Sequence, residues 1–500
     1  MKGLTLNSKS WFLVVFVLSF ILLCFLIKTA LGLLGIERTF LLWILAFFNL
    51  LVSFGITESV LSFCYQKSEP PRLKQLDAYP RVALLYTTFD DLFLPALNQL
   101  SSQSYPNYDV FILDDSTEET CQKRIDPFGQ HYTIVRRCSR AGAKAGNLNN
   151  WLKQYGRQYP YFVILDNDSI IKDDFIETLM CYAQHPENKK SAIFQSLMEI
   201  WKPASRFARA INVEKIISNY TAIRLYNRLG FYLGWGHNAL FNTQAVLSIE
   251  GFDETMVGED INLGLRLIEE GYELKLVDVL SYEGLPDGVY KFARRDGRIS
   301  QSNLQVLFSS NWKIPFFTCF FLFIINLNKM SRLLVVLLNF YFLGVGFYYY
   351  VGPLINQLYV KYNSFKFLGC NLSLFGIYFL LPIGLGALSG RKTGISLKET
   401  VKSRIIWIAY DVGVCFYIAQ KVLSYLLFRT VQFKVTNQKT HGVKNRFLYY
   451  FSVFYFSAIL CIVAAISPSL AMIKLPWIIC FLILFLVNIW IFFGDKKHEI

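Results

Sequence analysis

Two acidic pairs stand where apolar, strand-like runs of the chain end. Asp114 and Asp115 end one such run, and Asp166 and Asp168 end another. Mg²⁺ in proteins is commonly held by one or two carboxylates together with phosphate oxygens. Acids are also common in turns, and some acidic pairs arise by chance in a chain with 36 Asp and Glu residues. The position of these pairs at strand ends favours a site for Mg²⁺ or Mn²⁺ and a diphosphate.

A third acidic group stands at the start of a predicted helix. Glu259 and Asp260 precede the helical pattern Ile261 to Glu270, where an acid can simply cap the helix N-terminus. A transferase needs one carboxylate to take the proton from an acceptor hydroxyl, and carboxylates bound to a metal cannot also do this. Asp260 is therefore the candidate general base.

Cationic and aromatic segments supply further candidates. The segment from Lys144 to Asn149 opens a predicted helix, where backbone N–H groups and a lysine suit phosphate, although a solvated lysine is the alternative. His237 follows the aromatic run Phe231 to Trp235 and is either a satisfied core histidine or a site residue. The basic cluster Arg294 to Arg298 either contacts lipid headgroups or neutralises a departing diphosphate.

Alternating strand and helix patterns predict how these groups are positioned. Helical patterns cover Gly142 to Tyr155 and Phe175 to Tyr182. Five short β-branched or aromatic runs are predicted strands: Val82 to Tyr86, Tyr108 to Leu113, Thr133 to Val135, Tyr161 to Leu165, and Ala192 to Gln195. The alternation predicts a mostly parallel sheet with helices on both faces, and ligands bind such sheets beyond the carboxyl ends of the strands.

The rest of the chain is more apolar than a soluble domain. Hydrophobic residues make up 54% of the 500 positions, and the mean hydropathy is +0.35. Six runs are long enough, or nearly so, to cross a hydrocarbon core of about 30 Å: Trp11 to Ile27, Phe40 to Ile56, Leu333 to Tyr350, Phe367 to Leu388, Phe447 to Ile466, and Leu475 to Phe493. The first is expected to stay in the mature protein, because a second span follows at once.

The basic residues that flank the first two spans predict the topology. Lys2 and Lys9 precede the first span, and Lys67 and Arg72 follow the second. By the positive-inside rule both flanks are cytosolic, so the region of about 250 residues before the third span is cytosolic too. We expect a multi-pass protein of the cell (inner or plasma) membrane.

Three further segments are apolar on one face but carry charges: Phe207 to Phe231, Tyr290 to Leu307, and Ile395 to Phe428. They are predicted to lie in the membrane interface. The last could instead be a seventh span, but six spans keep the basic stretch Lys434 to Arg446 in the cytosol. The expected organisation is two spans (1–65), a soluble domain with interfacial helices (66–312), an interfacial segment and two spans (313–394), an interfacial helix and a loop (395–446), and two final spans (447–500).

Charge and cysteine content exclude other classes of protein. The formal net charge of +14 arises from Lys and Arg near the span ends and after residue 290, so topology and anionic phosphates explain it better than a nucleic-acid partner. The ten cysteines contain no Cys-x-x-Cys pair. Neither a zinc site nor a disulfide framework is indicated.

Taken in order, the segments from about residue 80 to 445 resemble the membrane-processive family 2 glycosyltransferases typified by cellulose synthase. Five motifs of that family recur in its order: the nucleotide-contacting strand end at Thr87, the first acidic site at Asp114 and Asp115, the lysine-glycine-asparagine segment with Lys144 and Asn147, the metal-binding D-x-D at Asp166 and Asp168, and the base motif at Glu259 and Asp260. In the last motif Gly258 stands where threonine is usual.

Three further likenesses bear on the acceptor and on processivity. The segment from Arg295 to Ile299, with Arg298, resembles the Q/R-x-x-R-W signature, but Ile299 replaces its tryptophan. The segment from Phe433 to Thr436 resembles the cellulose synthase gating loop, with Lys439 one residue late, and implies that Thr436 contacts the nucleotide. The segment with Trp235, His237 and Asn238 is similar to the W-G-H-N-A segment of osmoregulated periplasmic glucan glucosyltransferases and cyclic β-glucan synthases, which favours UDP-glucose.

The resemblance implies a GT-A α/β domain on a six-span helical bundle with interfacial helices. It implies a single inverting displacement in which Asp260 is the base, Mg²⁺ or Mn²⁺ binds Asp168 with support from Asp166, and Arg298 helps to stabilise the leaving UDP. Trp235, His237, Asn238 and Glu259 would face the glycan acceptor. Two alternatives stay open: a non-processive transferase to a polyprenyl phosphate or lipid, which Ile299 favours, and an inactive nucleotide-binding scaffold or transporter.

Overall fold

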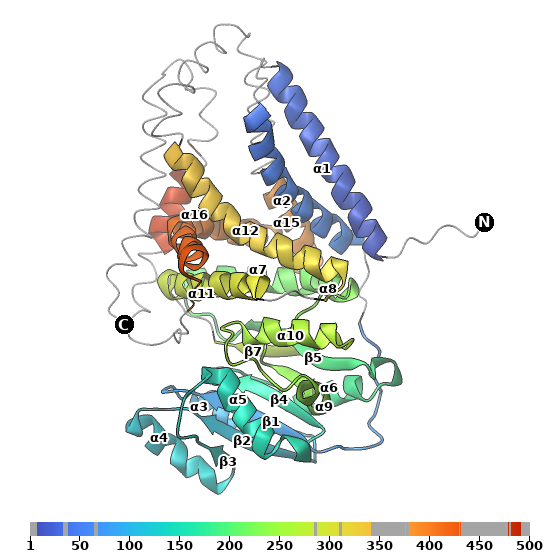
Figure 1. Cartoon of the computed structure of the whole chain (residues 1–500), viewed down its shortest axis with the longest axis vertical. Helices are drawn as coiled ribbons and strands as arrows, with labels where there is room; N and C mark the ends of the chain where they lie inside the picture. Colours follow the sequence, from blue (N-terminus) through green and yellow to red (C-terminus); the bar gives the residue numbers. More distant parts are fainter. Residues whose placement is uncertain are drawn as a thin grey trace, which may run out of the picture.

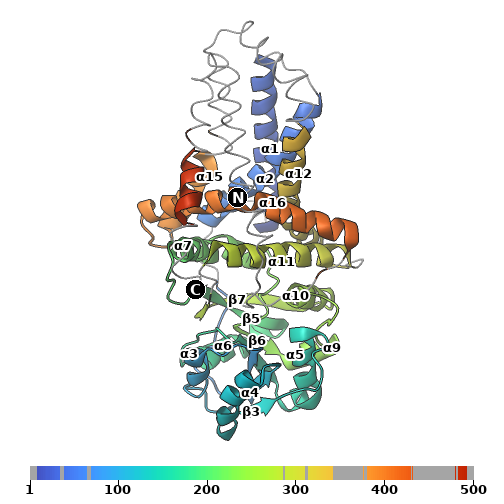
Figure 2. The ribbon, with the colours of Figure 1, turned by 90° about the vertical axis from the view of Figure 1, so that its left-hand side faces the viewer.

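The computed structural model describes residues 8–33, 39–64, 69–284, 288–309, 313–341, 376, 380–429, 431, 479 and 482–491. In Figures 1 and 2 these residues form three layers, with a sheet and its helices at the bottom, helices lying across the middle, and steep helices above. Several predicted segments lie outside the described residues: the loop Phe433 to Thr436 with Thr436, the basic stretch Lys434 to Arg446, the span Phe447 to Ile466, and parts of the other C-terminal spans.

One mixed sheet of seven strands forms the bottom layer, in the order β3-β2-β1-β4-β6-β5-β7. All neighbouring strands are parallel except at β6, which is antiparallel to both β4 and β5. The strands are β1 (Val82–Thr88), β2 (Tyr108–Asp114), β3 (Thr133–Val135), β4 (Tyr161–Asp166), β5 (Ser191–Ile200), β6 (Ala239–Asn242) and β7 (Glu273–Glu283). The five predicted strands and the mostly parallel sheet are confirmed, while β6 and β7 were not predicted.

Helices cover both faces of the sheet because alternate strand residues are apolar on both sides. On β1, Leu84 and Tyr86 enter one core cluster, whereas Ala83 and Leu85 enter the other. The first face packs against α3 (Leu94–Asn98) and α6 (Phe175–Ala183), and the second against α5 (Ala143–Gln154), α9 (Thr243–Ser248) and α10 (Glu259–Glu269). Smaller helices are α4 (Glu119–Ile125), η1 (Asp126–Gln130), η2 (Gly156–Gln158) and η3 (Pro186–Asn188).

The middle layer consists of α7 (Arg206–Tyr220), α8 (Ala222–Arg228), α11 (Val289–Phe308) and α16 (Leu397–Phe428). The predictions for α11 and α16 as helices are confirmed within two residues. The prediction of one helix from Phe207 to Phe231 is wrong, because the helix breaks at Thr221. There the Thr221 hydroxyl donates to the Ile217 carbonyl at 2.6 Å, a local hydrogen bond that bends helices.

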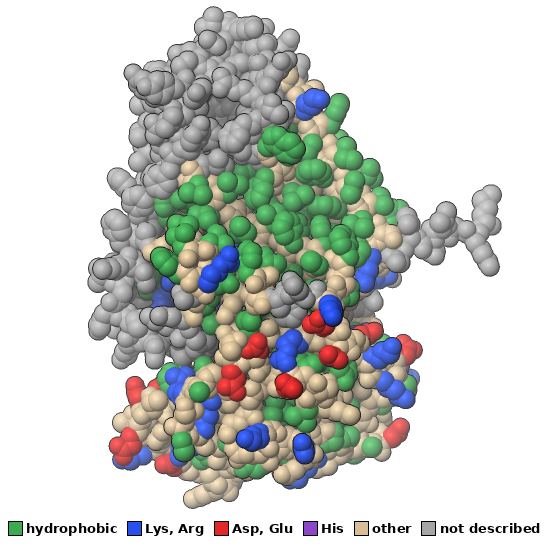
Figure 3. All heavy atoms as spheres, in the orientation of Figure 1, with side chains coloured by type: hydrophobic (Ala, Val, Ile, Leu, Met, Phe, Trp, Pro, Cys, Tyr) green, Lys and Arg blue, Asp and Glu red, His purple; other side chains and the backbone are tan. Residues whose placement is uncertain are grey.

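The upper layer contains α1 (Ser8–Leu33), α2 (Thr39–Cys64), α12 (Phe316–Tyr341) and α15 (Leu381–Arg391). By length and composition, three described helices could cross a membrane, over Ser8–Thr29, Phe316–Leu337 and Leu397–Phe428. The last of these, α16, lies across the molecule in Figure 2, whereas α1 runs along its length. Hydrophobic side chains dominate the described surface of the upper helices in Figure 3, whereas most charged side chains lie over the sheet domain below.

The predicted third span, Leu333 to Tyr350, begins too late. The helix starts at Phe316, because its polar residues are satisfied inside the protein and so do not interrupt it. Asn326 is fully buried and donates to the Leu322 carbonyl at 2.8 Å, and Arg332 pairs with Asp411 of α16 at 2.5 Å. The sequence pattern shows the polarity of these side chains but not their partners.

Candidate active site

Asp166 ends β4 beside the end of β1, where Thr87 is its register partner. The Thr87 hydroxyl lies 3.3 Å from Asp166 Oδ1, and Lys144 Nζ lies 2.5 Å from the same oxygen. Burial raises the pKa of Asp166, but the positive charges of Lys144 and His237 outweigh it and lower this pKa to about 2. Asp166 is therefore an anion at neutral pH.

Asp168 lies in the turn after β4, where its surroundings disfavour a negative charge, in contrast to those of Asp166. Burial, followed by the negative charges of Asp166 and Glu283, raises the pKa of Asp168 to about 7. Gly284 lies against it, since a Cβ atom at position 284 would stand 2.7 Å from Asp168 Oδ2. A divalent cation shared by Asp166 and Asp168 would offset their mutual repulsion.

The first acidic pair, Asp114 and Asp115, is held by arginines that follow β3. Arg136 Nε lies 2.7 Å from Asp114 Oδ2, and Arg137 forms two hydrogen bonds of 2.7 Å with the two oxygens of Asp115. Both carboxylates are buried, at 0% and 5% side-chain exposure. The structure thus shows that these ion pairs support the end of β2. Contact of Asp114 and Asp115 with a nucleotide stays a prediction.

The segment with Lys144 owes its shape to backbone contacts. A Cβ atom at Gly146 would overlap the Ala141 carbonyl oxygen, so glycine is needed there for the local fold. Asn147 is buried, and its amide donates to the Leu113 carbonyl at 3.1 Å, which ties α5 to the end of β2. Lys144 is the residue of this segment whose charge reaches the acidic end of β4.

The loop before β6 carries Trp235, His237 and Asn238. The Trp235 backbone N–H donates to Gln195 Oε1 at 3.0 Å, and its carbonyl oxygen lies 2.9 Å from His237 Nδ1. Asn238 is fully buried with φ +51°, and its amide donates to two oxygens of β7 residues at 3.0 and 3.2 Å. These contacts fix the loop to the sheet on both sides of His237.

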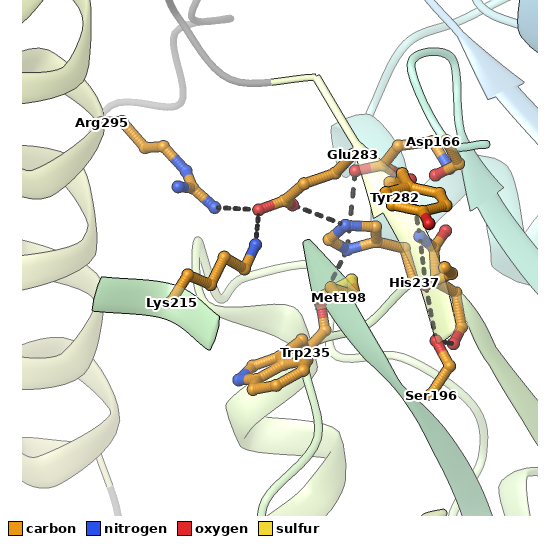
Figure 4. Close-up of polar contacts among 12 residues, drawn as sticks. Asp166, Ser196, Met198, Lys215, Trp235, His237, Tyr282, Glu283 and Arg295 are labelled. Atoms are coloured by element: carbon orange, nitrogen blue, oxygen red, sulfur yellow. Dashed lines mark hydrogen bonds and ion pairs between the residues drawn. The ribbon is translucent and has the colours of Figure 1, made fainter. Parts of the chain in front are cut away.

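Figure 4 shows how His237 connects Asp166 to the buried carboxylate of Glu283. His237 Nδ1 lies 3.8 Å from Asp166 Oδ2, and Nε2 lies 3.2 Å from Glu283 Oε2. Burial lowers the pKa of His237, but the charges of Asp166 and Glu283 raise it overall. Lys215 also pairs with Glu283, and Arg295 lies 3.7 Å from it. Despite burial, these cations hold the pKa of Glu283 well below its usual range.

The candidate base, Asp260, stands in the first turn of α10. Its Oδ1 accepts the Ile261 backbone N–H at 2.8 Å, so the capping alternative is partly realised. Gly236, at φ +73°, lies so close that a Cβ atom there would stand 2.5 Å from Asp260 Cβ. Burial and the charge of Asp260 raise the pKa of the neighbouring Glu259 to about 7, against the opposing charge of Lys144.

Lys144 and Arg298 lie close enough to Asp166, Glu259 and Asp260 for these carboxylates to affect their pKa values. Burial lowers the pKa of Lys144, but Asp166, Glu259 and Asp260 together raise it overall. Burial and the charge of Arg295 lower the pKa of Arg298, while the same three carboxylates oppose that shift. The C-terminal end of β4, the first turns of α5 and α10, and the middle of α11 therefore converge on one charged region. The roles of these residues in a reaction stay predictions.

The donor set fits a divalent cation shared with a phosphate group. Among the described residues, no group of three or more His, Cys, Asp or Glu side chains is arranged to hold a metal ion. Asp166 and Asp168 offer two carboxylates, and Mg²⁺ typically takes one or two carboxylates with phosphate and water oxygens completing its shell. These two residues would hold the ion.

Sequence reasoning missed the residues that support the site. Arg136 and Arg137 directly follow the predicted strand Thr133 to Val135, a position that could have identified them. Glu283 ends β7, which was not predicted, and Lys215 lies within the segment assigned to one interfacial helix. Their pairing depends on contacts between distant segments and leaves no local signal in the sequence.

Comparison with known proteins identifies a family over part of the chain. Residues 161–387 match the family model described as "Glycosyl transferase family group 2". Glucans biosynthesis glucosyltransferase H of Rhodopseudomonas palustris (strain BisA53) is 27% identical over 222 residues, which cover 40% of this chain and 30% of that protein. The protein of that name from Cereibacter sphaeroides is 26% identical over 306 residues, covering 54% and 51%. The chain thus spans about a third to a half of the length of these relatives.

Solved structures with a partial likeness include a mannosyltransferase, PcManGT from Pyrobaculum calidifontis, in complex with GDP-Man and Mn²⁺. It is 14% identical with a TM-score of 0.45, covering 76% of this chain and 97% of that one. S. aureus TarS 1-349 in complex with UDP is 13% identical with a TM-score of 0.32, covering 72% and 97%. Residues 161–387 thus form a glycosyltransferase family 2 domain, and the glucosyltransferases named above are its relatives over part of the chain.

Proposed function

We propose that this chain is an inverting membrane glucosyltransferase, which moves glucose from UDP-glucose to a growing β-glucan and couples this extension to translocation. The observation that carries the proposal is the convergence of Asp166, Lys144, Asp260 and Arg298 at the carboxyl ends of β1 and β4. The names of the curated relatives support a glucan product.

Each of these groups can act in a single displacement reaction at the anomeric carbon of the sugar. Asp260 takes the proton of the acceptor hydroxyl, whose oxygen attacks the anomeric carbon on the face opposite UDP. The bond from that carbon to the diphosphate breaks, and Lys144, Arg295 and Arg298 offset the charge that develops on the leaving UDP. Mg²⁺ or Mn²⁺, when held by Asp168 and Asp166, would supply further electrostatic stabilisation of the diphosphate.

The proposed acceptor side consists of Trp235, His237, Asn238 and Glu259. Trp235 is half-buried and packs edge-on against Tyr232, with ring centroids 5.6 Å apart. Its ring would offer the terminal sugar a flat apolar surface in place of the tryptophan that Ile299 replaces. Thr87, Asp114, Asp115, Asn147 and Thr436 would complete the nucleotide side.

We place the sheet domain in the cytosol and the steep helices in the cell membrane. Lys9 in the first turn of α1 and Arg72 after α2 support this orientation by the positive-inside rule. The middle layer would then lie in the interface, where an apolar face and a charged face suit lipid and water respectively.

A second candidate is a non-processive transferase that adds one sugar to a polyprenyl phosphate or another lipid. The observation that favours it is Ile299, which cannot stack on a sugar as a tryptophan does. The length of the product separates the two candidates, because a polymer excludes single transfer.

The decisive assay uses the purified full chain in lipid nanodiscs with Mg²⁺ or Mn²⁺ and a panel of nucleotide sugars. We expect UDP release and sugar incorporation with UDP-glucose, with inverted β-linkages in the product. Turnover with another sugar alone would overturn the donor assignment. No turnover with any nucleotide sugar would overturn the transferase proposal itself.

A further inference from the structure

Glu283 is a buried carboxylate to which neither the sequence motifs nor the proposed displacement assigns a role. Its side chain is 5% exposed, at the end of β7. Lys215 comes from α7, His237 from the loop before β6, and Arg295 from α11, and all three approach the two Glu283 oxygens (Figure 4). One anion thus joins three elements that are far apart in the sequence.

The contacts of Glu283 are divided between its two oxygens. Lys215 Nζ and Arg295 Nη2 approach Oε1, while His237 Nε2 lies 3.2 Å from Oε2. The next residue, Gly284, donates its backbone N–H to the Asp168 carbonyl at 3.2 Å. The last residue of β7 therefore contacts the cations, and the residue after it contacts the proposed metal-binding turn.

We propose that Glu283 is a positioning residue for sugar transfer, which holds Arg295 on the donor side and His237 on the acceptor side at a fixed spacing from Asp168. The inference rests on the proposed function, because donor and acceptor sides are defined by it. On this proposal Glu283 acts through Arg295 and His237 and makes no contact of its own with the sugar or the diphosphate.

The free-energy cost of burying a charged side chain favours this role over a role in packing alone. A buried carboxylate is costly unless charges and hydrogen bonds compensate it, and an apolar residue of similar size would avoid that cost. Packing alone would not require a charge at position 283. The Glu283 carboxylate lies between Lys215 and Arg295 and offsets the repulsion between these two cations.

Loss of the Glu283 charge should change kinetics in a way that unfolding does not. Residues that orient the ligands of metal sites typically contribute about 10- to 100-fold to affinity or activity, and we expect an effect of this order here. In Glu283→Gln we expect the KM for UDP-glucose to rise by about 10-fold or more, because Arg295 loses its anchor. A variant that merely lost folded protein would show a lower apparent kcat at an unchanged KM.

The test compares four proteins: wild type, Glu283→Gln, the double variant Glu283→Gln with Lys215→Met, and the control Glu273→Gln. Glu273 lies on the same strand in an exposed pair with Lys275 at 2.6 Å, so its loss should change neither stability nor KM. Thermal unfolding and donor KM are measured for each. The double variant removes the uncompensated Lys215 charge, so we expect its unfolding midpoint to recover toward wild type while its KM stays raised.

Two results would overturn the inference: an unchanged donor KM in Glu283→Gln, or a KM in the double variant that recovers together with stability. Both presuppose an active wild type. A wild type that transfers no sugar would instead refute the proposed function, so the two failures are distinguishable.

Discussion

At the scale of single residues, two neighbouring carboxylates of this site have different pKa values because their surroundings differ. The pKa of Asp166 is lowered to about 2, whereas the pKa of Asp168 is raised to about 7. The difference follows from position: Lys144 and His237 contact Asp166, while burial and two nearby anions act on Asp168. Such a pair would be stabilised by a divalent cation, which would supply positive charge beside Asp168.

The first prediction concerns that cation. Asp168→Ala should weaken UDP binding when Mg²⁺ or Mn²⁺ is present and leave it nearly unchanged in chelator, because the carboxylate acts on the diphosphate through the metal. Isothermal titration calorimetry with UDP, with and without metal, measures both conditions. Asp174→Ala, an exposed acid beyond the same turn, is the control and should behave as wild type. An equal loss of UDP affinity in chelator would contradict the metal-binding role.

The second prediction concerns pH and Glu259. Burial, then the charge of Asp260, raises the pKa of Glu259 to about 7 from 4.5. A raised folded-state pKa contributes stability below the unfolded pKa, and that contribution is lost as pH rises through about 7. Glu259→Gln should therefore be stabilised relative to wild type at about pH 8, by up to about 3 kcal/mol, and not at about pH 4. Thermal unfolding across this range measures the difference, and a pH-independent difference would argue against the shifted carboxyl.

At the scale of elements, the sequence was most informative where pattern and chemistry coincide. The strand ends at Asp114 and Asp166 and the start of α10 were predictable, because short β-branched runs end there in acids. Strand β6, Ala239–Asn242, contains no β-branched residue, and the alternation of buried and partly exposed residues in β7 did not lead to its prediction. Both strands are defined by their pairing with strands that are distant in the sequence. The position of Glu283 at the end of β7 depends on that pairing.

The third prediction tests the contact between the loop before β6 and α10. Gly236 and Gly271 both have positive φ, at +73° and +85°, but only Gly236 has Asp260 where a Cβ atom would be. Alanine at either position should cost about 1 to 2 kcal/mol of stability through backbone strain. Gly236→Ala should also lower kcat by about 10-fold or more, since a displacement of about 1 Å at a base can cost about 100-fold. Equal activities of the two variants would show that this contact does not position Asp260.

At the scale of the whole molecule, buried ion pairs attach the middle layer to the steep helices. Asp296 of α11 lies 2.7 Å from Lys329 and 3.5 Å from Arg332 of α12, and Arg332 reaches Asp411 of α16. The helix that carries Arg295 and Arg298 is thus bound to two candidate membrane helices. Composition predicts membrane helices and basic clusters, but not which charges meet, because that depends on how the layers pack.

The fourth prediction follows from this attachment. Asp296→Asn leaves Lys329 and Arg332 without their shared carboxylate and should destabilise the protein by about 3 to 5 kcal/mol, as the loss of one partner of a buried pair does. The control Asp126→Asn removes an exposed partner of Arg136, with 52% of its side chain accessible, and should cost at most about 1 kcal/mol. Thermal unfolding in nanodiscs compares them. Similar midpoints for the two variants would mean that the layers are held together by apolar packing alone.

The central claim is that this chain transfers a sugar with Asp260 as its base. The most direct measurement is the turnover of Asp260→Asn with UDP-glucose, alongside its affinity for UDP in Mg²⁺ and the same measurements on Glu270→Gln, an exposed acid at the end of the same helix. The account predicts a loss of about 10²- to 10⁴-fold in kcat with nearly unchanged UDP affinity, because the base acts only in the transition state. Transfer by Asp260→Asn within a few-fold of wild type would contradict it.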